Sequence, residues 1–299
     1  MLRALVGPTA SGKSQAGLAL AEAFGSDVAS VDSMLVYRGM DIGTAKPSAG
    51  DRARVPHHLI DLVEPSERFT VSRFQEEARA VMAQAGSPLL VGGSGLYFRA
   101  VVDGLVFPPE DAVVRAALQA EADELGGDDL YARLSKADPV AAAKIDPANV
   151  RRIIRALEVT AITGAPFSDF AKAWERYDPT RARIAGVAME RDVQARRIGS
   201  RVQAMLEAGW LDEVRALVAR GFGAWLTATQ AIGYAELTRH LDGRLELDEA
   251  VEHIVRRTKE LARRQTAWFR RDPRIRWFEV GDAGAIEVVD EVRAYLEAA

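Results

Sequence analysis

The stretch Gly7-Pro8-Thr9-Ala10-Ser11-Gly12-Lys13-Ser14 decides the fold, because it matches the phosphate-binding pattern G-x-x-x-x-G-K-S. Residues 2–6 are apolar apart from Arg3 and predict a buried strand, and residues 16–24 predict a helix that ends at Gly25. Strand, glycine loop and helix are the order that the pattern requires. Glycines let the N–H groups of such a loop turn toward an anion, and the helix N-terminus adds partial positive charge.

The side chains of this loop indicate a site for a di- or triphosphate. Lys13 supplies a mobile full charge, and the hydroxyl of Ser14 can coordinate Mg²⁺. The pattern specifies neither which phosphate compound is bound nor the reaction that it undergoes. The residues that we expect to hold the phosphates are Gly7, Thr9, Ala10, Ser11, Gly12, Lys13 and Ser14.

Composition narrows the class of protein. The 299 residues are 48% hydrophobic and contain no cysteine, which excludes disulfides and cysteine-bound zinc. There is no apolar run long enough to cross a bilayer and no signal peptide before the first strand, so we expect a cytoplasmic protein. The net charge of −4 argues against a nucleic-acid partner, but a local concentration of charge can outweigh the net value.

Asp32 follows the second predicted strand, at residues 27–31, and a third strand at 89–91 runs into the turn Gly92-Gly93-Ser94-Gly95. The carboxyl ends of parallel strands meet at one edge of a sheet, where ligands bind. We therefore expect Asp32 and this turn to lie beside the phosphate loop. Motor ATPases and GTPases place a magnesium-binding aspartate after such a strand, so the glycines here argue against that class.

The chain between and after these strands gives further predictions. Residues 34–47 lack a helical pattern and predict a long functional loop, whereas residues 72–85 predict an amphipathic helix with a capping box of Ser72 and Gln75. The composition changes at 108, and we expect a helical insertion over residues 108–185 between the two parts of an α/β core, 1–107 and 186–299. A last sheet strand before the long C-terminal helices is predicted at 186–189.

Basic residues are concentrated on three of the predicted helices. Arg151, Arg152 and Arg155 share one side of a helix in the insertion, and Arg197 and Arg201 lie on a second helix. The third helix covers residues 248–269. From Arg256 to Arg271, which includes most of this helix, there are seven basic residues and one acidic residue, a local charge of +6. Such a concentration is typical of a polyphosphate partner, although solvated surface charge remains the alternative.

Seven blocks of sequence resemble the bacterial tRNA dimethylallyltransferases. They are GPTASGKS (7–14), SVDSMLVYRGMDIGTAKP (30–47), PHHLID (56–61), VGGSGLYF (91–98), RRIIRALEV (151–159), AIGY (231–234) and ARRQTAWFR (262–270). The first block is common to many nucleotide-binding proteins, whereas the second is long and specific. Ser94 stands where the family usually has threonine, and this change keeps the hydroxyl.

The resemblance implies transfer of a dimethylallyl group from dimethylallyl diphosphate to N6 of adenosine 37, in tRNAs that read codons beginning with U. It also implies a P-loop kinase-like α/β fold, a helical insertion that contacts the anticodon stem-loop, and a requirement for Mg²⁺. We expect a monomer, because one site can face one anticodon loop. The residues implied to bind tRNA are Asp32, Ser33, Met34, Leu35, Tyr37, Ser94, Arg151, Arg152, Arg155, Arg197, Arg201, Gln230, Ile232, Gly233, Tyr234, Arg256, Arg257, Arg263 and Arg264.

Within this resemblance Asp32 is the expected acceptor of the N6 proton. Thr9 is the second residue expected to be catalytic, and it would act through its hydroxyl. Three alternatives use the same phosphate loop: a small-molecule kinase, a prenyltransferase acting on free adenine nucleotides, and an RNA-binding regulator with a vestigial loop. The kinase and the nucleotide prenyltransferase need no basic helices, and the regulator does not need an intact Lys13 and Asp32. For Asp32 itself, a structural role as a helix or turn cap is the alternative.

Overall fold

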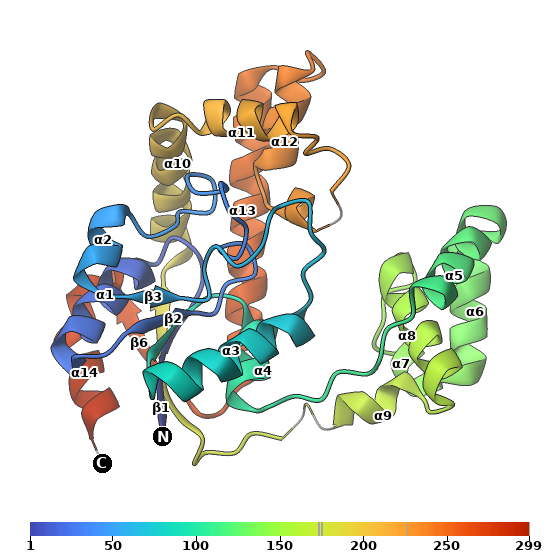
Figure 1. The fold of residues 1–299 in the computed structure, drawn as a ribbon, viewed down its shortest axis with the longest axis horizontal. Helices are drawn as coiled ribbons and strands as arrows, with labels where there is room; N and C mark the ends of the chain where they lie inside the picture. Colours follow the sequence, from blue (N-terminus) through green and yellow to red (C-terminus); the bar gives the residue numbers. More distant parts are fainter. Residues whose placement is uncertain (173, 175, 226, 299) are drawn as a thin grey trace. The chain divides into compact units, whose positions relative to one another are not determined.

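A computed structural model describes residues 1–172, 174, 176–225 and 227–298 of the chain (Figure 1). The chain divides into two compact units, one formed by Met1–Gly104 with Asp178–Ala299 and the other by Leu105–Tyr177. The first unit is an α/β core that contains the sheet, and the regular elements described in the second are all helices. The predicted insertion, 108–185, was therefore placed too far along the chain at its C-terminal end.

The core unit contains a six-stranded parallel sheet with the strand order β3-β2-β4-β1-β5-β6. The strands are β1 (Leu2–Val6), β2 (Val28–Ser30), β3 (His57–His58), β4 (Leu89–Gly92), β5 (Ala182–Met189) and β6 (Ile275–Val280). The fold class predicted from the phosphate loop, a parallel sheet flanked by helices, is confirmed. Strand β5 begins four residues before the predicted 186, because Ala182–Ala185 already pair with β1.

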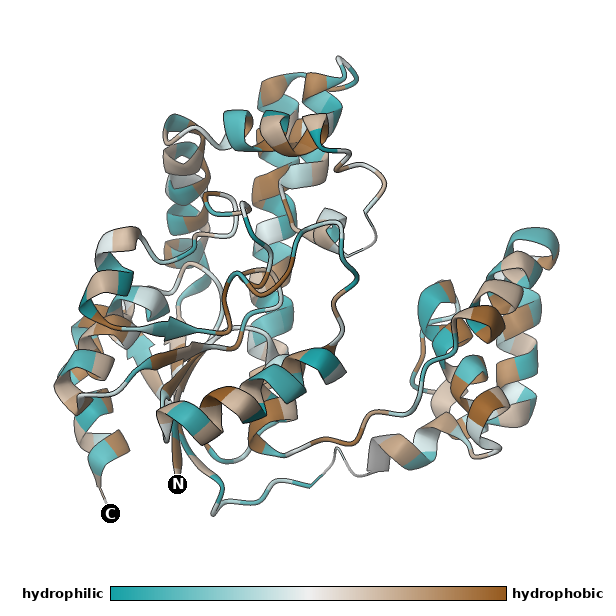
Figure 2. Cartoon of the chain, in the orientation of Figure 1, coloured by the Kyte–Doolittle hydropathy of each residue, from teal (hydrophilic) through white to brown (hydrophobic). Residues whose placement is uncertain are grey.

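Helices cover both faces of the sheet. The helices of the core unit are α1 (Lys13–Phe24), α2 (Ala49–Arg54), α3 (Val71–Ala85), α4 (Gly95–Val102), α10 (Arg191–Glu207), α11 (Trp210–Ala219), η2 (Ala228–Gln230), α12 (Tyr234–Leu241), α13 (Leu247–Phe269), η3 (Gly284–Val288) and α14 (Val289–Glu297), of which α11 and α12 lie away from the sheet (Figure 1). Successive residues of β1 point to opposite faces: Leu5 packs with α1 and α14, and Ala4 and Val6 pack with the cluster that includes α3, α4 and α13. Hydrophilic and hydrophobic positions alternate along these helices (Figure 2), as expected for helices that cover a sheet on one side.

The second unit has a hydrophobic core of its own. Its helices are α5 (Ala112–Leu125), α6 (Gly127–Ala137), α7 (Pro139–Ala142), α8 (Val150–Thr163) and α9 (Phe167–Lys172). Leu118, Leu134, Ile153 and Leu157 are among the residues buried between them. The amphipathic pattern that predicted helix α8 is explained by this packing, since its apolar face is buried.

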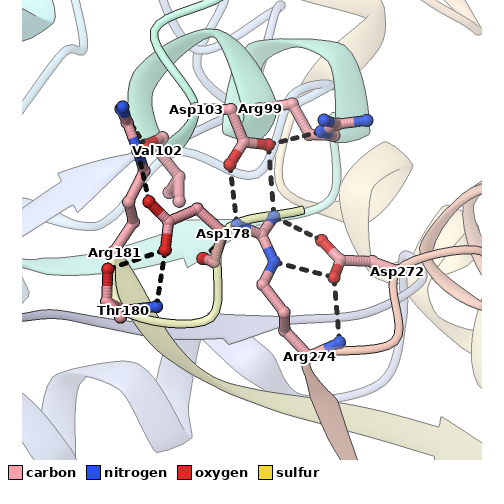
Figure 3. Close-up of polar contacts among 8 residues, drawn as sticks. All are labelled: Arg99, Val102, Asp103, Asp178, Thr180, Arg181, Asp272 and Arg274. Carbon is pink, nitrogen blue, oxygen red and sulfur yellow. Dashed lines mark hydrogen bonds and ion pairs between the residues drawn. The ribbon is translucent and has the colours of Figure 1, made fainter. Parts of the chain in front are cut away.

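A buried ion network closes the core unit where the chain leaves it and returns (Figure 3). Arg274, at the start of β6, donates to both oxygens of Asp103 at 2.7 and 3.1 Å and to both oxygens of Asp272 at 2.9 and 2.7 Å. It also donates to the backbone carbonyl of Asp178 at 3.2 Å. The three charged side chains are at most 8% exposed. Arg274 thus links the last residues before the helical unit to the first residue after it.

Candidate active site

The phosphate loop connects β1 to α1 through residues 7–12. Ala10 and Gly12 have φ angles of 63° and 82°, in the left-handed region that turns successive N–H groups to one side. A Cβ atom at Gly12 would lie 2.9 Å from the backbone nitrogen of Ala285, so both space and φ favour glycine there. Ser11 is fully buried, and its hydroxyl donates to the carbonyl of Pro8 at 2.9 Å. The loop is therefore preformed around its own backbone.

Lys13 folds back onto this loop. Its Nζ donates to the carbonyl of Pro8 and, at 3.3 Å, to the hydroxyl of Ser11. Burial and, to a smaller extent, the positive charge of Arg201 together lower the pKa of Lys13 to about 7, against an opposing effect of the carboxylate of Asp32. Near neutral pH this side chain is therefore poised between its charged and uncharged forms.

Side chains of α10 and α13 hold Thr9 from three directions. Its N–H donates to Oε1 of Gln265 at 2.7 Å, and its carbonyl accepts from Nε2 of Gln194 at 3.0 Å. Its hydroxyl accepts from Nη1 of Arg201 at 3.3 Å, and burial lowers the pKa of that arginine. Sequence reasoning missed Gln194 and Gln265, because nothing local distinguishes a glutamine that supports a loop from one on a helix surface.

Arg197 also contacts the phosphate loop. Its Nε donates to the carbonyl of Ala10 at 2.8 Å, and its Nη1 donates to the carbonyl of Asp282. Both arginines of α10 that we predicted to bind tRNA, Arg197 and Arg201, thus lie against the loop that the sequence assigned to phosphate. Their position makes them candidates for holding the phosphate groups as well.

Asp32, Ser33 and Ser94 lie at the same edge of the sheet as the phosphate loop, because β4 lies between β2 and β1. Oδ1 of Asp32 accepts the N–H of Met34 at 2.8 Å. The hydroxyl of Ser94 accepts the N–H of Ser33 at 3.1 Å. Among the described residues no hydrogen bond engages Oδ2 of Asp32, so this oxygen is available to a substrate.

Helix α13 crosses this edge and explains the glycines of the turn after β4. A Cβ atom at Gly93 would lie 2.5 Å from Nε2 of Gln265, and one at Gly95 would lie 2.1 Å from the ring of Trp268. A side chain at Gly95 would force the ring of Trp268 to shift, and one at Gly93 would displace the side chain of Gln265 that holds Thr9. The glycines therefore let α13 approach the phosphate loop closely, in addition to any room that they leave for a substrate.

Residues predicted to bind tRNA lie in two further segments, the loop 34–47 and the junction 230–234 between η2 and α12. Met34 and Leu35 are half-buried, and Gln230 is exposed at the end of η2. Tyr37 is 2% exposed and Tyr234 is fully buried. The two tyrosines and Gly233 therefore belong to the core, whereas Met34, Leu35, Gln230 and Ile232 are the parts that a nucleotide can reach.

The predicted basic residues differ in how far the protein already uses them. Arg256, Arg263 and Arg264 of α13 are exposed, as are Arg151 and Arg152 of α8. Arg257 forms an ion pair with Glu236, a carboxylate that is 6% exposed. Arg155 donates to the carbonyls of Pro108 and Pro109 at 2.7 and 2.9 Å and to Glu158 at 2.8 Å, all within the helical unit. The charges of Arg155 and Arg257 are therefore already paired with groups of the protein itself.

The site also provides a position suited to Mg²⁺. Ser14 is exposed in the first turn of α1, beside the loop that would hold the phosphates. The residues that the structure describes contain no cluster of three or more histidine, aspartate or glutamate side chains that could hold a metal. Magnesium is commonly bound by one or two protein oxygens together with substrate phosphates and water, so the hydroxyl of Ser14 fits this role.

The sequence model of the IPP transferase family matches residues 35–272. This chain belongs to that family. It is 47% identical over 306 residues to the tRNA dimethylallyltransferase of Kineococcus radiotolerans, covering 99% of this chain and 95% of the relative. It is 45% identical over 285 residues to the tRNA dimethylallyltransferase of Desulforudis audaxviator, covering 94% and 92%. The family resemblance inferred from the sequence blocks is confirmed.

Solved structures agree with this membership. The tRNA isopentenylpyrophosphate transferase of Bacillus halodurans has a TM-score of 0.71 and 41% identity, covering 98% of this chain and 94% of that one. A eukaryotic dimethylallyltransferase acting on tRNA has a TM-score of 0.79 and 25% identity, covering 97% and 75%. Among the described residues of this family member, no helix has the length and apolar character needed to span a membrane.

Proposed function

We propose that this chain transfers a dimethylallyl group from dimethylallyl diphosphate to N6 of adenosine 37, in tRNAs that read codons beginning with U. The products are N6-(dimethylallyl)adenosine and diphosphate. The names of its relatives support the reaction. The observation in this molecule that carries the proposal is the shared sheet edge, where a phosphate loop lies beside a carboxylate with one unoccupied oxygen.

The first part of the mechanism concerns the leaving group. The bond between C1 of the dimethylallyl group and the diphosphate oxygen breaks, and negative charge grows on the diphosphate. The N–H groups of the loop, the positive end of α1 and Lys13 stabilise this growing charge. Bound Mg²⁺, held by Ser14 and the phosphates, would supply further charge compensation to the leaving group.

Thr9 contributes a hydroxyl to the site in addition to that of Ser14. Because its oxygen accepts from Arg201, its own proton is directed elsewhere and can be donated to a diphosphate oxygen. Gln194 and Gln265 hold the backbone of the same residue on both sides, which fixes the hydroxyl relative to the loop. Thr9 therefore acts as a positioned donor to the leaving group.

The second part concerns the nucleophile. The N6 lone pair of adenine is delocalised into the ring, so N6 attacks C1 effectively only if its proton is accepted. The N–H of Met34 holds Oδ1 of Asp32 in place, and Oδ2 accepts the N6 proton as the N6–C1 bond forms. The adenine must leave the anticodon-loop stack to reach this edge, which costs least in a single-stranded loop.

The remaining parts of the proposal concern tRNA and the setting. Exposed Arg256, Arg263 and Arg264 supply charge for the phosphate backbone, and Arg151 and Arg152 supply it on the helical unit. We infer that the protein works as a monomer in the cytoplasm, with one site for one anticodon loop.

Substitution of Asp32 tests the mechanism. Asp32→Asn keeps the shape and one acceptor oxygen but cannot take a proton, whereas Asp32→Ala loses both functions. We expect a graded loss in the single-turnover rate, with Asn intermediate and Ala worst, each about 10² to 10⁴-fold. Affinity for tRNA changes much less, because phosphate contacts carry most of it. Asp212→Asn, on the exposed side of α11, is the matched control.

The outcomes separate this proposal from the alternatives. A lower melting temperature with an unchanged rate would make Asp32 a structural cap and would refute its role as base. Incubation of the wild type with labelled dimethylallyl diphosphate and tRNA, AMP or ATP identifies the acceptor. Label in AMP or ATP alone, or ATP hydrolysis without transfer, would overturn the assignment to tRNA.

A further inference from the structure

The long loop at residues 34–47 has no helix or strand of its own, yet one carboxylate outside it holds its far end. Glu213 of α11 accepts the N–H groups of three consecutive residues: Asp41 at 2.8 Å, Ile42 at 2.7 Å and Gly43 at 3.2 Å. Successive N–H groups that converge on one anion form strong, charge-assisted hydrogen bonds. A single side chain, 170 to 172 residues away along the chain, thus accepts the N–H groups of all three residues.

Glu213 binds a second segment at the same time. The hydroxyl of Tyr234, the first residue of α12, donates to Oε1 of Glu213 at 2.7 Å. Tyr234 is fully buried, and both burial and the charge of Glu213 raise the pKa of its hydroxyl, which keeps it protonated as a donor. The carboxylate thus joins the loop to the Gly233–Tyr234 junction.

Trp210, one turn before Glu213 on α11, packs against the same two segments. Its ring is 1% exposed, and a Cβ atom at either Gly43 or Gly233 would lie 2.1 Å from it. Its ring also meets that of Tyr234 edge-on, with centroids 5.8 Å apart. Glycine at both positions is thus required for α11 to contact the loop and the junction together.

Within the loop, Lys46 transmits this anchoring toward Asp32. The side chain of Lys46 is 1% exposed, and its Nζ donates to Asp41 at 2.7 Å, to Asp61 at 2.6 Å and to the backbone carbonyl of Tyr37. Residues 33–37 are therefore held by Asp32 on the sheet, by backbone hydrogen bonds from residues 61–63 and, through Lys46 and Asp41, by Glu213. A change at Glu213 removes one of these supports, the one that also reaches α11 and the junction, and leaves the contacts of the phosphate loop unaltered.

We propose that Glu213 is a positioning residue for the nucleic-acid substrate, which holds the 34–47 loop and the 230–234 junction in the arrangement that receives the acceptor nucleotide. It contacts neither substrate. This inference rests on the proposed function, because it assigns the loop and the junction to tRNA. It predicts a selective effect on tRNA, since the residues that hold the phosphate loop come from α10 and α13 instead.

Steady-state kinetics with each substrate varied in turn test the proposal. Glu213→Ala removes every acceptor, and we expect the KM for tRNA to rise about tenfold or more, as for a binding-competent arrangement populated a tenth of the time. Glu213→Gln keeps one oxygen, so we expect partial rescue with a rise of about two- to fourfold. The KM for dimethylallyl diphosphate should stay within about twofold of wild type in both variants. Asp212→Asn, the neighbouring exposed carboxylate, should match wild type.

The positioning role of Glu213 can be tested even if one of the variants does not fold. If Glu213→Ala does not fold, the comparison of Glu213→Gln with Tyr234→Phe, which removes one donor only, uses the same two KM values. A lower melting temperature with an unchanged KM for tRNA, or equal changes in both KM values, would overturn the positioning role. If wild-type protein fails to label tRNA, the proposed function fails first; if it labels tRNA and the Glu213 variants do so equally well, only this inference fails.

Discussion

Binding of the diphosphate to this protein should weaken as pH rises above 7, because of the environment of Lys13. The pKa of Lys13 is lowered to about 7 by burial and by the nearby charge of Arg201. A diphosphate in the loop places negative charge beside the ammonium group and raises its pKa again. Above pH 7, therefore, the ligand-free protein has lost a proton that the complex retains, and binding must take up that proton.

The size of the effect follows from the fraction of protonated Lys13. With a pKa of about 7, about one half is protonated at pH 7, about one tenth at pH 8 and about one hundredth at pH 9. Since the apparent Kd is the intrinsic value divided by the competent fraction, it should rise about tenfold for each pH unit above 8. Each such step is about 1.4 kcal/mol of binding free energy. The rise ends where pH reaches the raised pKa of the complex.

Titration calorimetry with dimethylallyl diphosphate, in the absence of tRNA, measures this linkage. Buffers of different ionisation enthalpy report the number of protons taken up, which we expect to approach one per site at pH 8 to 9. Lys13→Arg is the matched control, because arginine stays charged throughout this range. Ionisation of the ligand is common to both proteins, so the difference between them isolates Lys13. Identical pH slopes and identical proton uptake would refute the reasoning.

Two further predictions concern tRNA binding and stability. Replacing the three exposed arginines of α13 (Arg256, Arg263 and Arg264) by glutamine should reduce the slope of log K for tRNA against log salt by about 2 to 3, with the KM for dimethylallyl diphosphate unchanged. An unaltered slope would mean that these charges are only solvated. Arg274→Ala should lower the free energy of unfolding by about 3 to 5 kcal/mol, because it leaves the buried carboxylate of Asp272 without a counter-charge, while Asp103 keeps only its ion pair with Arg99. Urea unfolding measures this loss, and a change below about 1 kcal/mol would contradict it.

The fold and the sheet edge of the site could be predicted because their signals are local. Each strand that leads to the edge is a short apolar run, and the functional residues follow directly in sequence: the phosphate loop after β1, Asp32 after β2 and the glycine turn after β4. The rule that carboxyl ends of parallel strands meet at one edge then brings them together. No long-range pairing had to be guessed for that step.

The supports of the site could not be predicted, because they join distant parts of the chain. The bond between Thr9 and Gln265 spans 256 positions, and nothing in the local pattern marks that glutamine. For the same reason, the helix cap that we predicted from local spacing is wrong. We predicted a capping box of Ser72 and Gln75, but Thr70 caps α3, and Gln75 is buried and donates to the carbonyl of Ala100 at 2.6 Å. A tertiary contact with α4 determined the role of Gln75, and local spacing did not.

Helix α13 shows why the charge pattern alone overstated the nucleic-acid surface. In a helix, neighbouring residues point about 100° apart, so Arg264 is exposed while Gln265 is turned toward Thr9. Counting charges along residues 256–271 treats the whole segment as one surface, yet Arg257 faces Glu236 and is neutralised there. The residues that remain exposed are adjacent in sequence to those that hold the phosphate loop. One helix therefore carries exposed arginines on one side and contacts the phosphate loop on the other. For this reason we expect substitution of Arg256, Arg263 and Arg264 to change the affinity for tRNA, and we expect diphosphate binding to be preserved because the contact of Gln265 with Thr9 is left intact.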